Sequence, residues 1–475
     1  MTVQVEMQTV PFEPADPKAA LAQLPHAPAV FALYGADAHA EPYIGRTPNL
    51  RARLERLLQP SPKHPRRLQL AGRVRRIEYR LTGSDFESLL LQFELLEAIY
   101  GPKSLERMHL GAPAFIRYLG GNPYPRITVT NRASYRPGQR EADWAYGPFQ
   151  SRASAERFAD EALKLFLLRR CTDDLSPHPD HPGCVYSEMK MCLAPCYKGC
   201  TDERYAEESN AVEQFLATRG ESRLVAIRTQ RDQASADLEF ETAAQLHALV
   251  QRVESIRTLA PELVRPLSQL RAVILQPSAS PDEVSIFLFE NGRLIGPAAY
   301  STIGMRIQNE ASGSSSLFAQ PMMIEAIPEQ TETLPNISPK EAKDLASPPE
   351  SQDLQAEECQ GTTSVVPKRQ SREVRALAPE GPALSAKLPR SLLESRLDSV
   401  LGSLGPPDDP PSPTASQGHL ALLKRWYYRP EVRRSGEICF PDAEGRWPFK
   451  SILRSIGRVA AKSLQNQIPP DKIQT

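Results

Sequence analysis

The chain has few cysteines for its length, no long apolar run and no excess of charge of either sign. Its seven cysteines among 475 residues are too sparse for a disulfide scaffold, so closely spaced thiols are better explained as metal ligands or redox groups. No run of about 18 apolar residues occurs, and the N-terminal MTVQVEMQTVPFEPADP lacks the basic and apolar regions of a signal peptide. We therefore expect a soluble, cytoplasmic protein with no membrane partner.

The net charge does not indicate a class of binding partner, because basic and acidic residues each number 57. A local patch does: residues 46–80 hold eleven Lys or Arg against two carboxylates, Glu55 and Glu78. Guanidinium groups match phosphate geometry and release counterions from nucleic acid, although a solvated helix face with extended arginines is the alternative. The arginines that we predict to bind DNA are Arg46, Arg51, Arg56, Arg73, Arg75 and Arg76.

Proline marks a division of the chain. Fifteen of the 45 prolines lie in residues 305–415, together with one aromatic residue, Phe318. Such a stretch buries too little apolar surface to offset the entropy of ordering, so we predict a disordered linker there. The length of the chain also requires more than one domain. We expect an α+β multidomain protein.

Residues 25–105 have the pattern of a small α/β domain. PAVFALYG and PYIGR each predict a short strand, and NLRARLERLLQ predicts a helix with its leucines on one face. RVRRIEYRLTG alternates as a strand does, and an apolar helix follows until Gly101-Pro102. Residues 106–168 are expected to be a connecting strand and helix.

Five of the seven cysteines fall within residues 169–202. Thiolates bind soft metals, and four around one centre make a structural zinc or iron–sulfur site. The spacings fit neither stock pattern and do not choose the metal, and buried or free cysteines that merely cluster are the alternative. The predicted ligands are Cys171, Cys184, Cys192 and Cys196, with Cys200 outside the set.

Residues 218–258 have the pattern of two helices that meet near residues 238–241, with an apolar seam between them. Ala243 and Ala244 allow close approach, and Phe240 near the tip is a hydrophobic anchor. A pair of helices has little core of its own, so it either joins a bundle or pairs with a partner.

The remaining segments are a β element and a basic, aromatic C-terminus. Residues 268–304 predict a strand and then a hairpin with an Asn291-Gly292 turn. Residues 416–463 alternate basic and aromatic residues, which suits contact with phosphates and bases. We favour the alternative, in which this segment docks on the folded part through Trp426, Tyr427, Trp447 and Phe449.

Several of these segments together resemble one family. Phe31 to Tyr34, Tyr43-Ile44-Gly45 and Arg53 resemble the GIY-YIG nuclease pattern, and within it the UvrC family, the excinuclease C proteins of bacterial nucleotide excision repair. ESLLLQFELLE, NPYPRITVT, the cysteine segment ending in CLAPC, and LEFETAAQL are similar to family segments, the last to the UVR motif. The resemblance ends near residue 304, since neither the family's RNase H-like nuclease nor its helix-hairpin-helix motifs follow.

The resemblance implies roles in phosphodiester cleavage. Tyr43 would be the general base, Arg53 the phosphate-binding cation, and position 92 the ligand of Mg²⁺ or Mn²⁺. A phenol with a pKa near 10 would need Arg53 or the metal to lower it. Gln92, however, stands where the family has glutamate, and an amide is a poor replacement for a carboxylate around Mg²⁺. Read without the family, Tyr43 is an ordinary strand tyrosine.

The resemblance also implies a cofactor and partners. It places a [4Fe–4S] cluster on the four cysteines, with zinc as the alternative, and pairs the hairpin with excinuclease B (UvrB) through Phe240, Ala243 and Ala244. The expected function is that of a UvrC-like protein of nucleotide excision repair, binding damaged DNA with UvrB and making a metal-dependent cut. A catalytically impaired adaptor that binds DNA and UvrB is the alternative, and a zinc-stabilised regulator outside repair is a third hypothesis.

Overall fold

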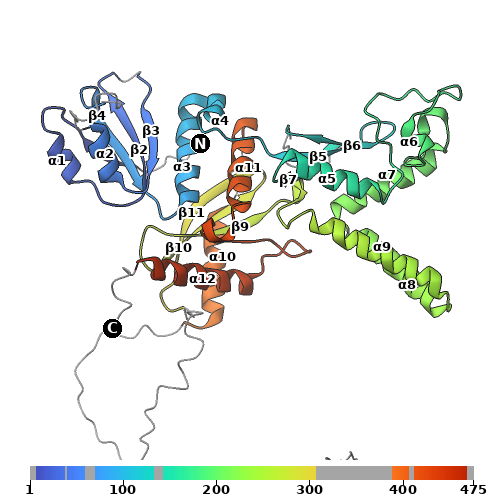
Figure 1. The fold of residues 1–475 in the computed structure, drawn as a ribbon. Coiled ribbons are helices and arrows are strands. Elements are labelled where there is room, and N and C mark those ends of the chain that lie inside the picture. The colour runs from blue at the N-terminus through green and yellow to red at the C-terminus, as the bar shows by residue number, and fades with distance from the viewer. Residues whose placement is uncertain are drawn as a thin grey trace, which may run out of the picture. The chain divides into compact units, whose positions relative to one another are not determined.

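Three small antiparallel sheets, each of four strands, organise the part of the chain that the structure describes (Figure 1). The structure is a computed structural model, and it describes residues 7–37, 40–58, 70–132, 143–305, 388–405 and 411–467. Helices pack against these sheets, which confirms the predicted α+β class. The predicted linker lies outside the described residues at 306–387 and 406–410.

The first sheet has the strand order β1-β4-β2-β3. Its elements are β1 (Gln8–Pro11), α1 (Pro17–Ala22), β2 (Ala29–Gly35), β3 (Tyr43–Thr47), α2 (Leu50–Leu58), β4 (Val74–Leu81) and α3 (Asp85–Tyr100). The predicted strands and helices are all present. The predicted start at residue 25 is wrong, because Val10 and Phe12 bring β1 into the same core.

In the two GIY-YIG-like strands, β2 and β3, a large side chain packs against a residue that has no side chain. Phe31 of β2 stands directly opposite Gly45 of β3. A Cβ at position 45 would lie 2.8 Å from the Phe31 ring, so glycine is required there. Asn49 then caps α2, since its Oδ1 accepts a hydrogen bond from the Ala52 N–H at 3.0 Å. Ser84 caps α3 in the same way through Glu87 N–H.

The second sheet has the order β6-β5-β7-β8 and a core of its own. Its elements are β5 (Ala114–Leu119), β6 (Arg126–Thr130), β7 (Asp143–Phe149), α5 (Arg152–Leu163), α7 (Asp202–Ala217) and β8 (Arg265–Pro266). Residues 106–168 are therefore a domain core, and the prediction of a connecting segment is wrong. The short helices α4 (Ser104–Arg107) and α6 (Val185–Glu188) precede and follow this region.

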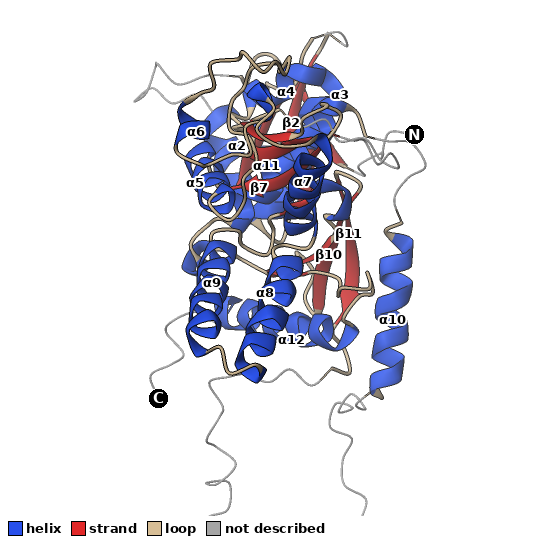
Figure 2. Ribbon diagram, turned by 90° about the vertical axis from the view of Figure 1, so that its right-hand side faces the viewer, coloured by secondary structure: helices blue, strands red, loops and turns tan. Residues whose placement is uncertain are grey.

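Two neighbouring helices occupy residues 221–258, within the segment where the sequence predicted a helical hairpin. α8 (Glu221–Ala236) and α9 (Phe240–Thr258) lie side by side (Figure 2), and Leu238 takes a left-handed φ of 62° in the turn between them. Leu224, Ile227, Val253 and Ile256 are buried at the root of the hairpin, where they join the core of the second sheet.

The third sheet corrects two predictions. β9 (Ala272–Pro277), β10 (Glu283–Glu290) and β11 (Arg293–Ser301) form the predicted strand and hairpin, but β12 (Glu437–Cys439) adds a fourth strand beside β9. The β element is thus a sheet completed by the C-terminal segment, and not a lone hairpin.

Helices from the C-terminal part cover this sheet. They are α10 (Arg390–Ser403), α11 (Pro413–Tyr427) and α12 (Phe449–Gln467). The prediction of a disordered linker is wrong over residues 388–405 and 411–415, because the leucines of α10 pack into the core beneath the sheet. Docking of the C-terminal segment is confirmed: Trp426 is 1% exposed and contacts Phe86 of α3 at a ring separation of 5.4 Å.

The contact between α3 and α11 generates a test of this fold. Gly418 of α11 lies against the Phe93 ring of α3, so a Cβ at position 418 would overlap that ring. We expect Gly418→Ala to lower the free energy of unfolding by about 1–3 kcal/mol, as overpacked cores do. Urea denaturation of the full chain, followed by circular dichroism, measures the change.

Gly457→Ala is the matched control, because no atom lies within 4 Å of a Cβ at that position of α12. There the better helix propensity of alanine is expected to raise stability by up to about 1 kcal/mol. Equal denaturation midpoints for the two variants would contradict the close packing of α3 on α11.

Candidate functional site

The predicted base and phosphate-binding cation lie on the first sheet and its helix α2. Tyr43 is half-buried on the edge strand β3 and packs against the core, with its ring centroid 6.1 Å from that of Phe31. Arg53 is half-buried on α2. The strand and the capped helix hold both side chains on rigid elements.

The predicted metal position lies on α3, which runs along β3. Tyr100 at the end of this helix donates a hydrogen bond to the Pro42 carbonyl at 3.2 Å, and Asp85 at its start forms an ion pair with Arg46. Gln92 is half-buried midway between these anchors. Among the described residues, however, no hydrogen bond or ion pair joins any two of Tyr43, Arg53 and Gln92, so their shared role stays a prediction.

The N-terminal carboxylates of α3 already have partners. Asp85 lies between two guanidinium groups, that of Arg46 and that of Arg429 at 2.7 Å. Glu87 is buried and accepts a hydrogen bond from the Gly83 N–H at 2.9 Å. Neither group is placed to replace a ligand at position 92.

The same holds for the two carboxylates that follow Gln92. Glu97 accepts a hydrogen bond from the Ser412 hydroxyl at 3.0 Å, across to the start of α11. Burial raises the pKa of the Glu94 carboxyl to about 7, and the nearby charges of Arg293 and Arg80 oppose the rise. Glu94 is therefore under the influence of one cation from the third sheet and one from the first.

The predicted DNA-binding arginines fall into two sets. Three have carboxylate partners: Arg46 pairs with Asp85, Arg51 with Glu55 at 3.3 Å, and Arg76 with Glu78 at 2.9 Å. The other three, within the described ranges, form no ion pair. They are Arg56, Arg73 and Arg75. Glu55 and Glu78 were counted in the sequence, and Asp85, which lies outside residues 46–80, neutralises one further arginine of this surface.

The four predicted ligand cysteines are shielded to different degrees: Cys196 is buried, and Cys171, Cys184 and Cys192 are half-buried. Burial raises the pKa of the Cys192 thiol, and Cys184, Cys196 and Cys171 add to the rise. These thiols therefore influence one another electrostatically, and their ligation of one common centre stays a prediction. Among the described residues, no set of three or more His, Cys, Asp or Glu side chains has the geometry of a single-ion site.

Two features beside these thiols oppose the effect of burial on their pKa values. Arg169 is 1% exposed, and its Nη1 contacts the Cys171 sulfur at 3.5 Å while donating to the Asp173 carbonyl at 2.8 Å. Ala194 takes a left-handed φ of 56°, and its backbone N–H lowers the pKa of Cys192. A buried cation and backbone donors favour the charged sulfur that binds soft metals. The donor set therefore fits a thiolate-bound metal or cluster.

Sequence analysis missed Arg169 as part of this site. It directly precedes the cysteine segment in LFLLRRC, yet a basic residue in such a position is ordinarily taken as solvent-exposed. The position of Arg169 between an apolar run and the first cysteine was the feature of the sequence that could have indicated its burial. Its burial is also supported by Tyr205, whose hydroxyl accepts a hydrogen bond from the Arg169 N–H at 3.2 Å.

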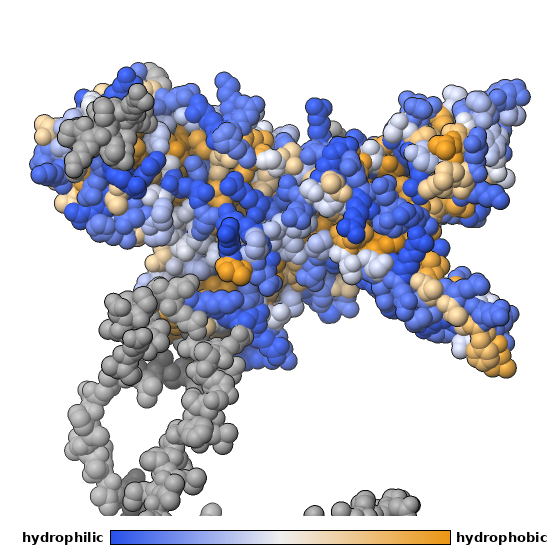
Figure 3. All heavy atoms as spheres, in the orientation of Figure 1, coloured by the Kyte–Doolittle hydropathy of each residue, from blue (hydrophilic) through white to orange (hydrophobic). Residues whose placement is uncertain are grey.

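The tip of the hairpin is apolar and exposed. Leu238 is 71% exposed and Phe240 67%. Ala244 is also exposed, whereas Ala243 is half-buried. Figure 3 shows hydrophobic atoms gathered at the outer end of α8 and α9. Large apolar side chains exposed together mark interaction surfaces in soluble proteins.

Comparison with known proteins gives one family. Residues 116–215 match the model of the UvrC/Cho excinuclease middle domain. The curated relatives include the UvrABC system protein C of Alcanivorax borkumensis, 29% identical over 51% of this chain and 39% of the relative. That of Ruminiclostridium cellulolyticum is 29% identical over 54% and 41%, and that of Haemophilus ducreyi 25% over 60% and 45%.

The chain thus covers less than half of the length of these relatives. No solved structure is significantly similar to it. Among the helices that the structure describes, none has the length and apolar character needed to span a membrane.

Proposed function

We propose that this chain, which belongs to the UvrC excinuclease family over about half of its length, is a UvrC-like component of nucleotide excision repair that binds DNA and UvrB. The observation that carries the proposal is the match to the middle domain, because the matched residues 116–215 include all four predicted ligand cysteines. The first sheet precedes that domain and the hairpin follows it, which is the order that the sequence resemblance implies.

Binding and cutting are separable in this proposal. A metal-dependent cut needs a cation held near the scissile phosphate, and Mg²⁺ is ordinarily held by at least one carboxylate. Position 92 offers an amide. Asp85, Glu87 and Glu97 of α3 bind Arg46, Arg429, Gly83 and Ser412, and burial raises the pKa of the Glu94 carboxyl to about 7. This engagement favours an adaptor that binds DNA and UvrB over a nuclease.

A nicking assay separates the adaptor from the nuclease. We expect purified wild-type protein, with damaged duplex DNA and Mg²⁺ or Mn²⁺, to nick no more than Tyr43→Phe does, while both retard the duplex equally in a gel shift. Gln92→Glu restores a carboxylate at the ligand position and is expected to raise metal-dependent nicking. Metal-dependent nicking by the wild type above the Tyr43→Phe level would establish the nuclease instead.

We further propose that Cys171, Cys184, Cys192 and Cys196 hold a [4Fe–4S] cluster, with zinc as the alternative. The support is the electrostatic effect of Cys171, Cys184 and Cys196 on the Cys192 thiol, together with the contact of the buried Arg169 with Cys171. Such a group would fix the loop between α5 and α7, because its ligands come from several points along that loop.

Metal analysis tests the cluster. Protein purified without oxygen is expected to be brown and to contain iron and sulfide, and Cys196→Ser is expected to lose both. Cys200→Ser is the matched control and should keep them, since Cys200 is a half-buried thiol outside the predicted set. Colourless protein that contains zinc and no iron would replace the cluster by the zinc alternative.

We propose that the tip of the hairpin binds UvrB. Leu238 and Phe240 form an apolar anchor without a partner among the described residues, and large aromatic side chains at the centre of interfaces carry much of the binding energy. The interior face of the hairpin root is already occupied by the core of the second sheet. The exposed tip is therefore the part left for another chain.

Phe240→Ala tests this contact. We expect the dissociation constant for UvrB to rise by about 30-fold, which corresponds to the roughly 2 kcal/mol of an interface hot spot. Isothermal titration calorimetry measures it. Val225→Ala is the control: Val225 is also exposed, at 55%, but lies about 18 Å from the tip along α8. An unchanged affinity of Phe240→Ala would remove the hairpin from the interface.

A further inference from the structure

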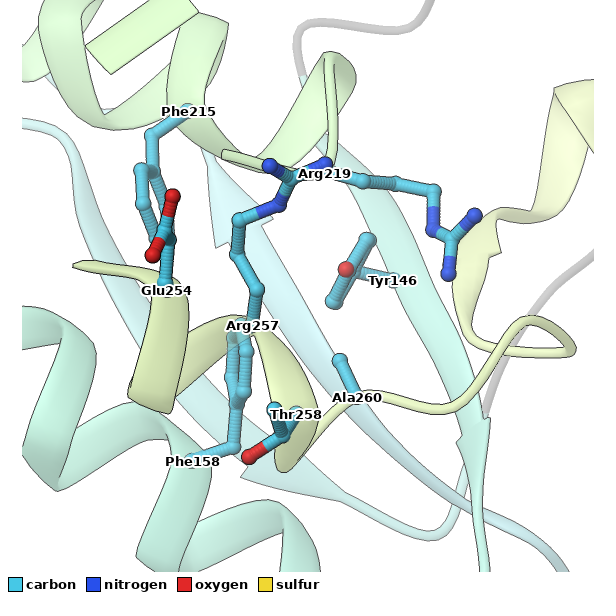
Figure 4. Close-up of a pocket in the computed structure, with 8 residues that line it drawn as sticks. All are labelled: Tyr146, Phe158, Phe215, Arg219, Glu254, Arg257, Thr258 and Ala260. Carbon is cyan, nitrogen blue, oxygen red and sulfur yellow. The ribbon is translucent and has the colours of Figure 1, made fainter. Parts of the chain in front are cut away.

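A pocket of about 310 Å³ lies where the root of the hairpin meets the second sheet (Figure 4). Aromatic rings from β7, α5 and α7 form its walls, namely Tyr146, Phe158 and Phe215. Two arginines enter it from other elements: Arg219 from the turn after α7, and Arg257 from α9. Neither the cysteine segment nor the GIY-YIG-like strands contribute to this pocket.

Arg219 is an incompletely satisfied cation. Its Nε is buried without a hydrogen-bond partner, and no carboxylate of the described residues forms an ion pair with it. Its backbone has a left-handed φ of 53° directly after a helix, a position that usually takes glycine or asparagine. An arginine kept in such a conformation beside a pocket points to a requirement for its side chain.

The neighbouring turn is shaped to hold the second arginine. Gly220 also has a left-handed φ, of 86°, and a Cβ there would lie 2.9 Å from the Arg257 Cγ. The stem of Arg257 thus runs close over the glycine, and its guanidinium pairs with Glu221 at 3.0 Å. Glu254, the carboxylate in the pocket wall, is neutralised by Arg228 at 2.7 Å.

A third arginine adds positive charge at the edge of this region. Arg265 donates to the Glu262 carbonyl and lies over the Phe440 ring at 4.1 Å, but it forms no ion pair among the described residues. Burial lowers the pKa of Arg265 to about 10, and the like charge of Arg219 contributes to that lowering. Two guanidinium groups thus repel each other in a partly desolvated place, and an anion would relieve that repulsion.

Tyr146 supplies a neutral donor. It is 1% exposed, and burial raises its pKa to about 12, so its hydroxyl keeps its proton at neutral pH despite the opposing effect of Arg219. In Figure 4 the hydroxyl lies between Arg219 and Ala260. The pocket therefore combines guanidinium donors, a phenol donor and aromatic walls.

We propose that this pocket binds a phosphate ester through Arg219, Arg257 and Tyr146. The planar guanidinium fork matches the oxygens of a phosphate, and charge-assisted hydrogen bonds of this type are strong. The volume is at the lower end of the range for small-molecule sites and accommodates a group of mononucleotide size. A free nucleotide and the terminal phosphate of a DNA strand share this chemistry. The proposal does not depend on the repair function or on UvrB.

Calorimetric titration of the full chain tests the site with three defined ligands: inorganic phosphate, deoxyadenosine monophosphate and deoxyadenosine. The two phosphates are expected to bind saturably and deoxyadenosine is not. Arg219→Gln is expected to weaken the binding of the monophosphate by about tenfold or more, as the loss of a charged hydrogen bond does. Arg152→Gln is the control, because Arg152 is exposed on α5 and pairs with Glu156 at 2.7 Å, outside the pocket.

Tyr146→Phe is the second variant, because it keeps the buried ring and removes only the hydroxyl. We expect a several-fold loss of affinity with unchanged thermal unfolding. Two fluorescent oligodeoxynucleotides, with and without a 5′-phosphate, distinguish the sources. A preference for the phosphorylated strand that Arg219→Gln abolishes identifies a DNA end, and binding of the monophosphate alone identifies a free nucleotide. Absence of binding by every phosphate ligand, or wild-type affinity in Arg219→Gln, overturns the proposal.

Discussion

Helix α3 is buried on two sides, and much of the rest of the structure depends on that double contact. One side packs on β2 and β3 of the first sheet, where Arg46 and Pro42 hold its two ends. The other side places Phe86 and Phe93 in a core with the third sheet and α11. A helix that serves two cores has few positions free for chemistry, because nearly every face of it is needed for packing.

This constraint bears differently on the DNA binding and on the cutting that the proposed function considers. The first sheet keeps the strand pair, the glycine and the capped α2 that position Tyr43 and Arg53. The helix that should supply a metal ligand instead uses its carboxylates to hold arginines, a backbone N–H and a serine hydroxyl. Position 92 has no carboxylate, and other carboxylates of α3 already have partners. The two observations are therefore consistent with each other. Both observations agree with the proposal of an adaptor that binds DNA without cleaving it.

The sequence was sufficient to predict those elements whose local residue pattern agrees with their packing in the folded chain. The strands of the first sheet and the hairpin α8–α9 were predicted, because alternation and helical periodicity are local signals. Helix α10 was missed because its leucines lie within a proline-rich region whose overall composition predicts disorder. Strand β12 was missed because a strand of three residues is too short to show an alternating pattern. The partners of Asp85 and the burial of Arg169 were beyond sequence analysis. Each depends on residues brought together by the fold, such as Arg429 with Asp85.

The third sheet has a consequence for how the chain can change in evolution. The chain leaves this sheet after Gly304 and returns at Leu388, and the two residues are hydrogen-bonded to each other, Leu388 N–H to the Gly304 carbonyl at 3.2 Å. Tyr300 and Leu393 join the same two stretches of chain at 3.1 Å a little farther on. Residues 304 and 388 are thus held side by side in the folded chain. For any flexible connection between two such points, each doubling of its length costs only about 0.6 kcal/mol of loop closure, so this junction of the sheet is a place where changes of chain length are inexpensive.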